Sequence, residues 1–176
     1  MTTDLPPLAS GRPAETPEGL LARLAAEGIA TETLHHPPFF TVADGAEMHH
    51  RIPGLHVKNL FLKPKGEGPF LLLVLEAYRR VPVNALVRSL GVARASFAAA
   101  EDLWVELGVL PGSVTPLALV NSVPGRVRIA IDRMLLEAER INMHPLVNTA
   151  STVLAPGDLL RFLREMGHAP EALEIP

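Results

Sequence analysis

The chain has 176 residues, of which 48% are hydrophobic and 20% charged, which suits one domain with a sizeable core and excludes global disorder. The sequence contains no cysteine, which excludes disulfides, iron–sulfur clusters, thiolate zinc sites and a cysteine nucleophile. Its formal charge of -3 provides no overall attraction to nucleic acid.

Composition divides the chain into one domain and two short ends. Residues 1–16 are rich in proline, threonine and small residues, and they predict a flexible N-terminal arm without the pattern of a secretory signal. Residues 17–170 predict the single domain, and residues 171–176 predict a C-terminal tail. The longest aliphatic and aromatic run, residues 70–75, is far shorter than the roughly 20 residues that span a bilayer. We therefore expect a cytoplasmic protein that does not bind membranes.

Hydrophobic spacing and turn residues predict both helices and strands in the first two-thirds of the chain. Thr16 as N-cap, Pro17 in the first turn and Gly28 as a stop delimit the first helix. The connection Pro-Lys-Gly-Glu-Gly-Pro predicts a hairpin, whose second strand is apolar on both faces and therefore central. In chain order we expect a helix over 17–27, a strand over 29–35, a weak helix over 43–51, strands over 57–63 and 70–76, and helices over 83–90 and 100–107.

The last third of the chain changes to a period-two pattern, which predicts a hairpin with one buried face. In chain order we expect hairpin strands over 117–121 and 127–131, further strands over 140–143 and 151–154, and an amphipathic closing helix over 158–166. Neither strict βαβ alternation nor a repeat is visible. The expected fold class is therefore α+β, or mixed α/β, with a partly curled mixed sheet flanked by helices.

Three segments carry side chains suited to chemistry. Lys58 shares a strand face with two leucines, so it is either a strand-end residue that reaches water or a charge held in a pocket for an anion. Asn59 lies on the opposite face of the same strand. The loop from Gly112 to Pro116 allows backbone N–H groups to approach a ligand, but GxxxP spacing is very common and is usually that of a plain loop. His144 follows a predicted strand, where either a ligand site or a structural histidine is common.

The basic residues are distributed unevenly. The three lysines, Lys58, Lys63 and Lys65, fall within eight consecutive residues, whereas the arginines are spread through the rest of the chain. This clustering fits either a local contact with a polyanion or a solvated strand end and turn.

Other polar clusters give weaker signals. His49, His50 and His56 near Glu47 suggest a metal site by composition, but adjacent histidines do not share a face and no HExxH spacing occurs. No serine has the GxSxG context of a hydrolase nucleophile. The serines considered for this role are Ser96, Ser113 and Ser151.

Six short motifs, taken in order, are similar to the YbaK and prolyl-tRNA-synthetase-associated editing family, and most closely to its free-standing ProX-type members. The motifs are His36-Pro37-Pro38, Lys58-Asn59-Leu60-Phe61-Leu62, Arg94-Ala95-Ser96-Phe97, Leu107-Gly108-Val109, Pro111-Gly112-Ser113-Val114-Thr115-Pro116 and His144-Pro145-Leu146-Val147-Asn148. The resemblance covers residues 20–167, and it rests on the order and number of these motifs. It implies a mixed, partly barrel-like sheet with surrounding helices.

Members of this family hydrolyse the ester of mischarged tRNA, so the resemblance implies a trans-editing deacylase that acts on Ala-tRNA(Pro). The implied residues are, for catalysis, Lys58, Asn59 and His144; for substrate binding, Gly112, Ser113, Val114, Thr115 and Pro116; and for tRNA binding, Lys63 and Arg94. The implied partners are the acceptor end of proline tRNA and prolyl-tRNA synthetase, with neither DNA nor a membrane, and no cofactor or metal is expected.

The ester of an aminoacyl-tRNA is already activated, so such an enzyme needs mainly to hold the carbonyl, position a water and stabilise the oxyanion. Two alternatives stay open. One is a deacylase of the same family that acts on Cys-tRNA(Pro), and the other is a non-catalytic module that binds tRNA or a synthetase.

Overall fold

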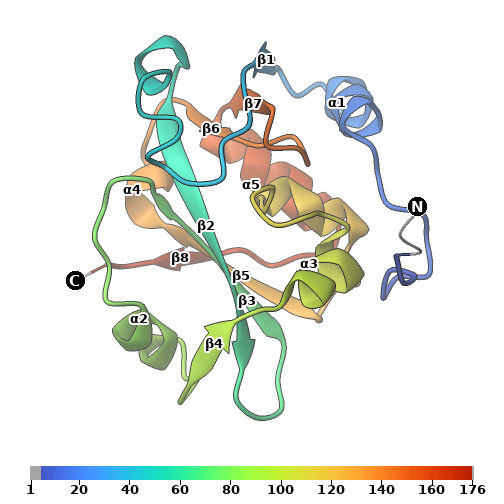
Figure 1. The fold of residues 1–176 in the computed structure, drawn as a ribbon, viewed down its shortest axis with the longest axis vertical. Helices are drawn as coiled ribbons and strands as arrows, with labels where there is room; N and C mark the ends of the chain where they lie inside the picture. Colours follow the sequence, from blue (N-terminus) through green and yellow to red (C-terminus); the bar gives the residue numbers. More distant parts are fainter. Residues whose placement is uncertain (1–4, 176) are drawn as a thin grey trace.

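A mixed sheet of eight strands runs through the computed structural model of the chain, which describes residues 5–175 (Figure 1). Seven strands follow the spatial order β1-β7-β6-β2-β3-β5-β8, and β4 pairs with β2 beside this path. In chain order the strands are β1 (Glu32–His35), β2 (Leu55–Pro64), β3 (Phe70–Glu76), β4 (Ala95–Phe97), β5 (Val127–Asp132), β6 (Ile141–Met143), β7 (Ala150–Leu154) and β8 (Glu171–Leu173). The mixed α/β class predicted from the sequence is confirmed.

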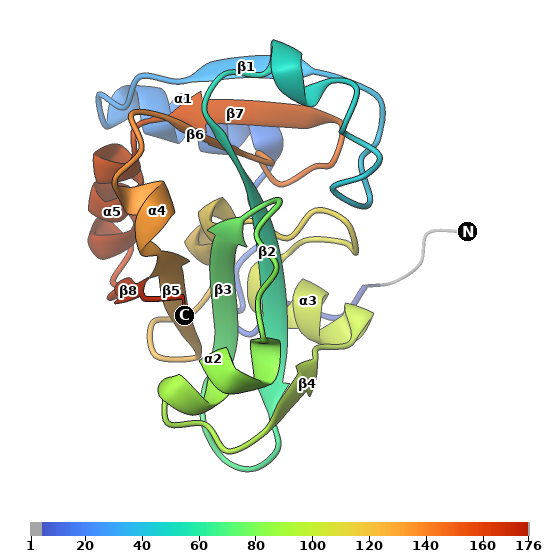
Figure 2. The same ribbon diagram turned by 90° about the vertical axis from the view of Figure 1, so that its left-hand side faces the viewer.

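Strand β2 belongs to both parts of the sheet. It pairs antiparallel with β3 over residues 57–62, and parallel with β6 at Leu55 and His56. Figure 2 shows β1 and β7 lying across the direction of β2 and β3, so the sheet curls strongly where β2 passes from one part to the other. The five middle residues of β3 are buried, as predicted for a central strand.

Helices cover the two faces of the sheet around β3. In chain order they are α1 (Pro17–Ala26), the 3₁₀ helix η1 (His49–Arg51), α2 (Val83–Ser89), α3 (Ala100–Leu107), the 3₁₀ helix η2 (Pro116–Asn121), α4 (Arg133–Leu136) and α5 (Pro156–Glu165). Successive residues of a strand point to opposite faces. Leu72 and Val74 of β3 therefore join the core formed with α1, α3 and α5, whereas Leu71, Leu73 and Leu75 join the core formed with α2.

The predicted helix boundaries follow from local capping. The Thr16 hydroxyl accepts a hydrogen bond from the backbone N–H of Gly19 at 2.9 Å, and Pro17 occupies the first turn of α1. At the end of α3, Gly108 adopts a φ of 64°, a left-handed conformation that favours glycine.

The predicted hairpin over residues 117–121 and 127–131 is wrong. Residues 116–121 form η2, and β5 pairs instead with β3 and β8. Pro116 begins this 3₁₀ helix, and the Thr115 hydroxyl accepts from the backbone N–H of Leu117 at 3.4 Å. All six residues of η2 are buried, so their alternation in the sequence does not mark a buried and a solvated face.

The chain ends contact the domain more closely than the predicted arm and tail suggest. Leu8 is buried, the backbone N–H of Ala9 donates to the carbonyl of Val105 at 2.7 Å, and the Trp104 indole N–H donates to the carbonyl of Pro6 at 2.7 Å. Residues 171–173 form β8 beside β5. Residues 1–4 of the predicted arm and Pro176 lie outside the described residues. Within residues 5–175, no helix combines the length and apolar character needed to cross a bilayer.

Asn121 provides a test of how the N-terminal segment is held. Its buried amide accepts from the backbone N–H of Glu15 at 2.8 Å and donates to the carbonyl of Leu107 at 2.9 Å. Asn121→Ala leaves both groups without this partner, so we expect the free energy of unfolding in urea to fall by about 2 kcal/mol. Ser122→Ala is the matched control, because the Ser122 hydroxyl makes only a 3.5 Å contact to the next carbonyl. Equal losses in the two variants would contradict this interpretation.

Candidate active site

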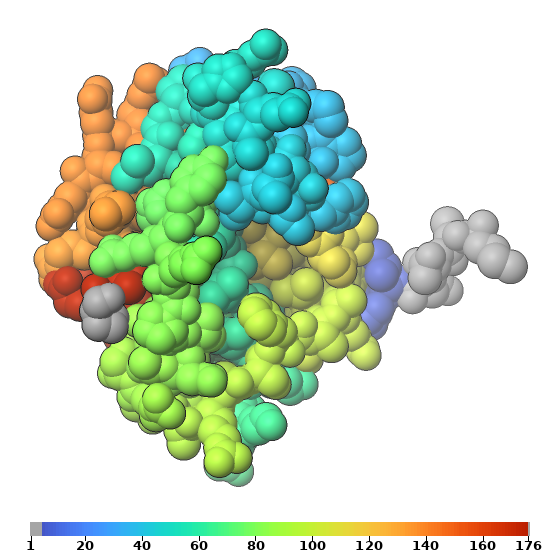
Figure 3. All heavy atoms as spheres, turned by 60° about the vertical axis from the view of Figure 1, so that its left-hand side comes forward, coloured from blue at the N-terminus to red at the C-terminus, as the bar shows by residue number. Residues whose placement is uncertain are grey.

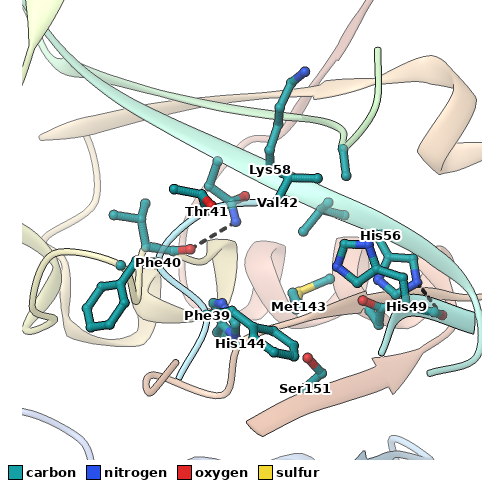
Figure 4. A pocket seen from close by; sticks show the side chains of 16 residues that line it. Phe39, Phe40, Thr41, Val42, His49, His56, Lys58, Met143, His144 and Ser151 are labelled. Carbon is teal, nitrogen blue, oxygen red and sulfur yellow. Dashed lines mark hydrogen bonds between the residues drawn. The ribbon is translucent and has the colours of Figure 1, made fainter. Parts of the chain in front are cut away.

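A cavity of about 300 Å³ opens beside β2 (Figures 3 and 4). Residues 39–42 and His49 from the loop after β1 form one wall, and residues 56–59 of β2 form another. The remaining walls come from the segment around Gly112, from residues 142–144 at the end of β6, and from β7. In Figure 3 the loop after β1, in blue to cyan, lies next to the yellow residues that follow α3. Segments distant in sequence therefore meet at one concave site.

The structure brings together most of the residues that the sequence predicts for catalysis and substrate binding. Lys58, Asn59 and His144 all line the cavity, together with Gly112 and Val114 of the predicted substrate loop. The other residues of that loop, Ser113, Thr115 and Pro116, are buried in the core and do not line the cavity. Two residues of this loop, Gly112 and Val114, therefore line the cavity, while Thr115 caps η2.

The side-chain amide of Asn59 forms a hydrogen bond through its nitrogen but, among residues 5–175, none through its oxygen. Its Nδ2 donates to the carbonyl of Val114 at 2.9 Å, which orients the side chain against the loop after α3. Its Oδ1 is buried and has no hydrogen-bond partner among residues 5–175. A buried acceptor without a partner costs about 1–3 kcal/mol. A ligand or water that donates to this oxygen recovers that free energy.

Lys58 extends from β2 away from His144 and Ser151 (Figure 4). Its ammonium donates to the carbonyl of Arg79, which follows β3. Burial lowers the pKa of Lys58 from its usual value, and the charges of Glu76 and Asp132 oppose this shift. Lys58 therefore places an ammonium group at the edge of the cavity rather than at its floor.

His144 is held in one tautomer by its position after β6. Because a carbonyl can only accept, the ring Nδ1–H donates to the carbonyl of Ala150 at 2.9 Å, and Nε2 is then the acceptor of the neutral ring. Burial lowers the pKa of His144, and the neighbouring His36 adds to this shift. The imidazole is thus neutral at pH 7 and can accept a hydrogen bond.

His36 and Ser151 form a buried pair that the sequence did not predict as part of the site. Nδ1–H of His36 donates to the carbonyl of Pro37 at 2.7 Å, so Nε2 accepts from the Ser151 hydroxyl at 2.9 Å. The His36 ring stacks on Phe39 with 3.8 Å between centroids, and it lies 6.1 Å from the His144 ring. The His36-Pro37-Pro38 motif was visible in the sequence, but nothing there indicates that β1 and β7 pair and bring Ser151 to it.

A second aromatic cluster lies at the η1 side of the cavity. The His49 and His56 rings stack with 4.0 Å between centroids, His56 Nε2–H donates to the carbonyl of His49 at 2.9 Å, and Tyr78 hydrogen-bonds to the His49 ring. Burial, with smaller contributions from His56 and His36, lowers the pKa of His49 to about 4. Within residues 5–175, no three His, Asp or Glu side chains are grouped closely enough to hold a metal ion.

The predicted tRNA contacts lie outside the cavity, toward the β2–β3 hairpin. Lys63 is half exposed, and its ammonium forms an ion pair with Asp102 Oδ1 at 2.9 Å. Arg94 is exposed next to Lys65, and both line a separate hollow together with Arg128. At about 3.3 Å per strand residue, Lys63 lies about 17 Å along β2 from Lys58.

Comparison with known proteins gives one consistent family. The family model described as "Aminoacyl-tRNA editing domain" matches residues 36–162. A cow protein named "Prolyl-tRNA synthetase associated domain-containing protein 1" is 36% identical over 92% of this chain and 96% of its own length. "Prolyl-tRNA editing protein ProX" of Acetoanaerobium sticklandii is 25% identical over 90% of this chain and 96% of its own length.

Solved structures support the same fold. A crystal structure of a candidate trans-editing enzyme for prolyl tRNA synthetase matches with a TM-score of 0.67 and 18% identity, over 89% of this chain and 95% of that one. At this identity the likeness shows the fold alone. The family match covers the loop after β1, all of β2 and the β6–β7 segment, which are the parts that build the cavity. The chain belongs to the aminoacyl-tRNA editing domain family.

Proposed function

We propose that this protein is a trans-editing deacylase that hydrolyses Ala-tRNA(Pro). The observation that carries the proposal is the convergence of Lys58, Asn59 and His144 on one cavity. These side chains come from β2 and from the loop between β6 and β7, and each offers a different interaction: a positive charge, a free amide oxygen and a neutral imidazole. The relatives in the prolyl-tRNA editing family support this choice of substrate class.

The reaction adds one water molecule across the aminoacyl ester. The water oxygen forms a bond to the carbonyl carbon, the bond from that carbon to the ribose oxygen breaks, and a proton from the water ends on the ribose oxygen. His144 Nε2 and Asn59 Oδ1 are acceptors for the water or for the amino group of the substrate. The ammonium of Lys58 binds the terminal phosphate or ribose, and the segment containing Gly112 lies along the bound ester. The free hydroxyl of the terminal ribose assists the water.

Selection of alanine requires a subsite within the cavity that holds a methyl side chain and is too small for the proline ring. A synthetase pocket that accepts proline rejects the smaller alanine weakly, because lost methylene contacts are worth only about 1–3 kcal/mol. An editing cavity that is too small for proline rejects it by steric overlap. Val57, Ala77 and Val114 provide small apolar surfaces for a methyl side chain in this cavity.

The purified protein should be incubated separately with alanyl-, cysteinyl- and prolyl-charged proline tRNA. The proposal predicts rapid loss of the alanyl ester and a stable prolyl ester. Selective loss of the cysteinyl ester would identify the related Cys-tRNA(Pro) activity instead. The absence of hydrolysis in all three reactions would support a binding module.

Replacing Lys58 tests the charge at the cavity edge. We expect Lys58→Ala to lower kcat/KM for Ala-tRNA(Pro) by about tenfold or more, because a hydrogen bond to a charged partner contributes about 1.5–3 kcal/mol. Arg88→Ala is the control, since it removes an exposed positive charge on α2, outside the cavity. Deacylation by Lys58→Ala at the normal rate would contradict the role assigned to Lys58.

The rate of deacylation should depend on the protonation of His144. Because burial lowers the pKa of His144, the neutral ring persists below its ordinary value of 6.5, and kcat should fall only at more acidic pH. His144→Gln should lower kcat and remove this acid limb. His49→Gln should leave the limb in place, because the proposal assigns the limb to His144 and not to the other histidines of the cavity. An acid limb that survives in His144→Gln would rule out His144 as the titrating group.

Replacing Lys63 and replacing Asp102 should change the affinity for tRNA in opposite directions. If Lys63 contacts a phosphate, Lys63→Gln should weaken binding and reduce the slope of log K against log salt by about 1. Asp102→Asn should strengthen binding, because it releases Lys63 from its ion pair. Arg161→Gln on α5 serves as the control for loss of a positive charge elsewhere. A salt slope unchanged in Lys63→Gln would argue against the phosphate contact.

A further inference from the structure

Phe40 stands out because it lines the cavity and yet remains in solvent. Its side chain is 67% exposed, whereas the adjacent Phe39 is buried beneath His36. Among the exposed large apolar side chains of residues 5–175, Phe40 is the one that lines this cavity. Figure 4 shows its ring directed away from the histidine and methionine side chains. The ring therefore lies at the mouth of the cavity rather than in its packed wall.

The backbone that carries Phe40 is held by a short turn. The backbone N–H groups of Phe40 and Thr41 donate to Asp44 Oδ2 at 2.9 and 2.8 Å. These two bonds lower the pKa of Asp44, so the carboxylate stays charged and keeps accepting them at neutral pH. The turn therefore holds the backbone that carries the ring.

Gly112 supports one side of the ring. A Cβ atom built on Gly112 would lie 2.9 Å from Phe40 Cδ1, closer than carbon atoms approach without a shift. The φ of Gly112 is +89°, which also favours glycine at this position. The same Cβ position lies 3.3 Å from the Asn148 amide nitrogen, so a side chain at position 112 would be crowded on two sides. Phe40 thus lies against Gly112 on one side, while most of its side chain is exposed.

We propose that Phe40 is a stacking platform for the 3′-terminal nucleobase of the tRNA. This inference rests on the proposed function, because it takes the aminoacyl ester to lie in the cavity beside Asn59 and His144. The ester is attached to the terminal ribose, so the base on that ribose must leave through the cavity mouth. An exposed aromatic ring on a held backbone at that mouth offers the base a flat apolar surface.

Stacking on Phe40 would separate the affinity for the common 3′ end of tRNA from the discrimination among different tRNAs. All tRNAs end in the same nucleotide, so stacking on Phe40 strengthens binding without distinguishing one tRNA from another. Discrimination among tRNAs then falls to contacts elsewhere, such as those proposed for Lys63 and Arg94.

The test is a binding measurement with an uncharged RNA hairpin that carries the acceptor stem and its 3′ single strand. One version ends in adenosine, and the other ends in an abasic ribose. For the unmodified protein we expect about tenfold weaker binding of the abasic hairpin. For Phe40→Ala we expect about tenfold weaker binding of the adenosine hairpin and less than a twofold difference between the hairpins. Phe40→Trp should restore the difference.

Phe97→Ala is the matched control, because Phe97 is 70% exposed and lies on β4, away from the cavity. Whatever its effect on affinity, that effect should be the same for both hairpins. The inference is overturned if the unmodified protein binds both hairpins equally or binds neither, or if Phe40→Ala still distinguishes them. The proposed function fails separately, if no charged tRNA is hydrolysed, because hairpin binding does not depend on hydrolysis.

Discussion

The continuity of β2 is the constraint on which the site depends. One edge of β2 pairs with β6 only at Leu55 and His56. Pairing of this edge with β4 begins at Leu62. Between these points one edge of the strand has no strand partner among residues 5–175, and the cavity opens along it. Lys58 and Asn59 lie in this gap. Because β2 is continuous, it fixes the distance between the cavity and the β2–β3 hairpin, where Lys63 and Lys65 lie.

The walls of the cavity provide hydrogen bonds more than charge. No aspartate or glutamate is among the lining residues of the described chain, and burial lowers the pKa of His49, His56 and His144. Lys58 is then the one lining side chain of this part of the chain that carries a full charge at pH 7. Under the proposed function, this polar interior would hold the ester group, and the ammonium at the edge would meet the phosphate.

Local signals in the sequence predicted most of the elements, because caps, stops and apolar spacing act over a few residues. They failed at η2, where every residue is buried, so the alternation of residues in the sequence does not distinguish a buried face from a solvated one. They also missed β4 and β8, which are only three residues long and depend on long-range pairing. The same division applies to the site. Family motifs indicated Lys58, Asn59 and His144. The Ser151–His36 pair and the position of Phe40 depend on how β1, β7 and the loop between β1 and η1 fold together, which no local pattern encodes.

The hydrogen bond between Trp104 and Pro6 makes the single tryptophan of the chain a reporter of the N-terminal segment. Trp104 belongs to α3 and is not part of the cavity lining, so its fluorescence follows the docking of residues 5–9 rather than occupancy of the site. A change in tryptophan emission when tRNA is added would therefore report either release of this segment or RNA bound beside Trp104 near the Lys63–Asp102 pair. An unchanged emission would mean that residues 5–9 stay docked on α3 when tRNA binds.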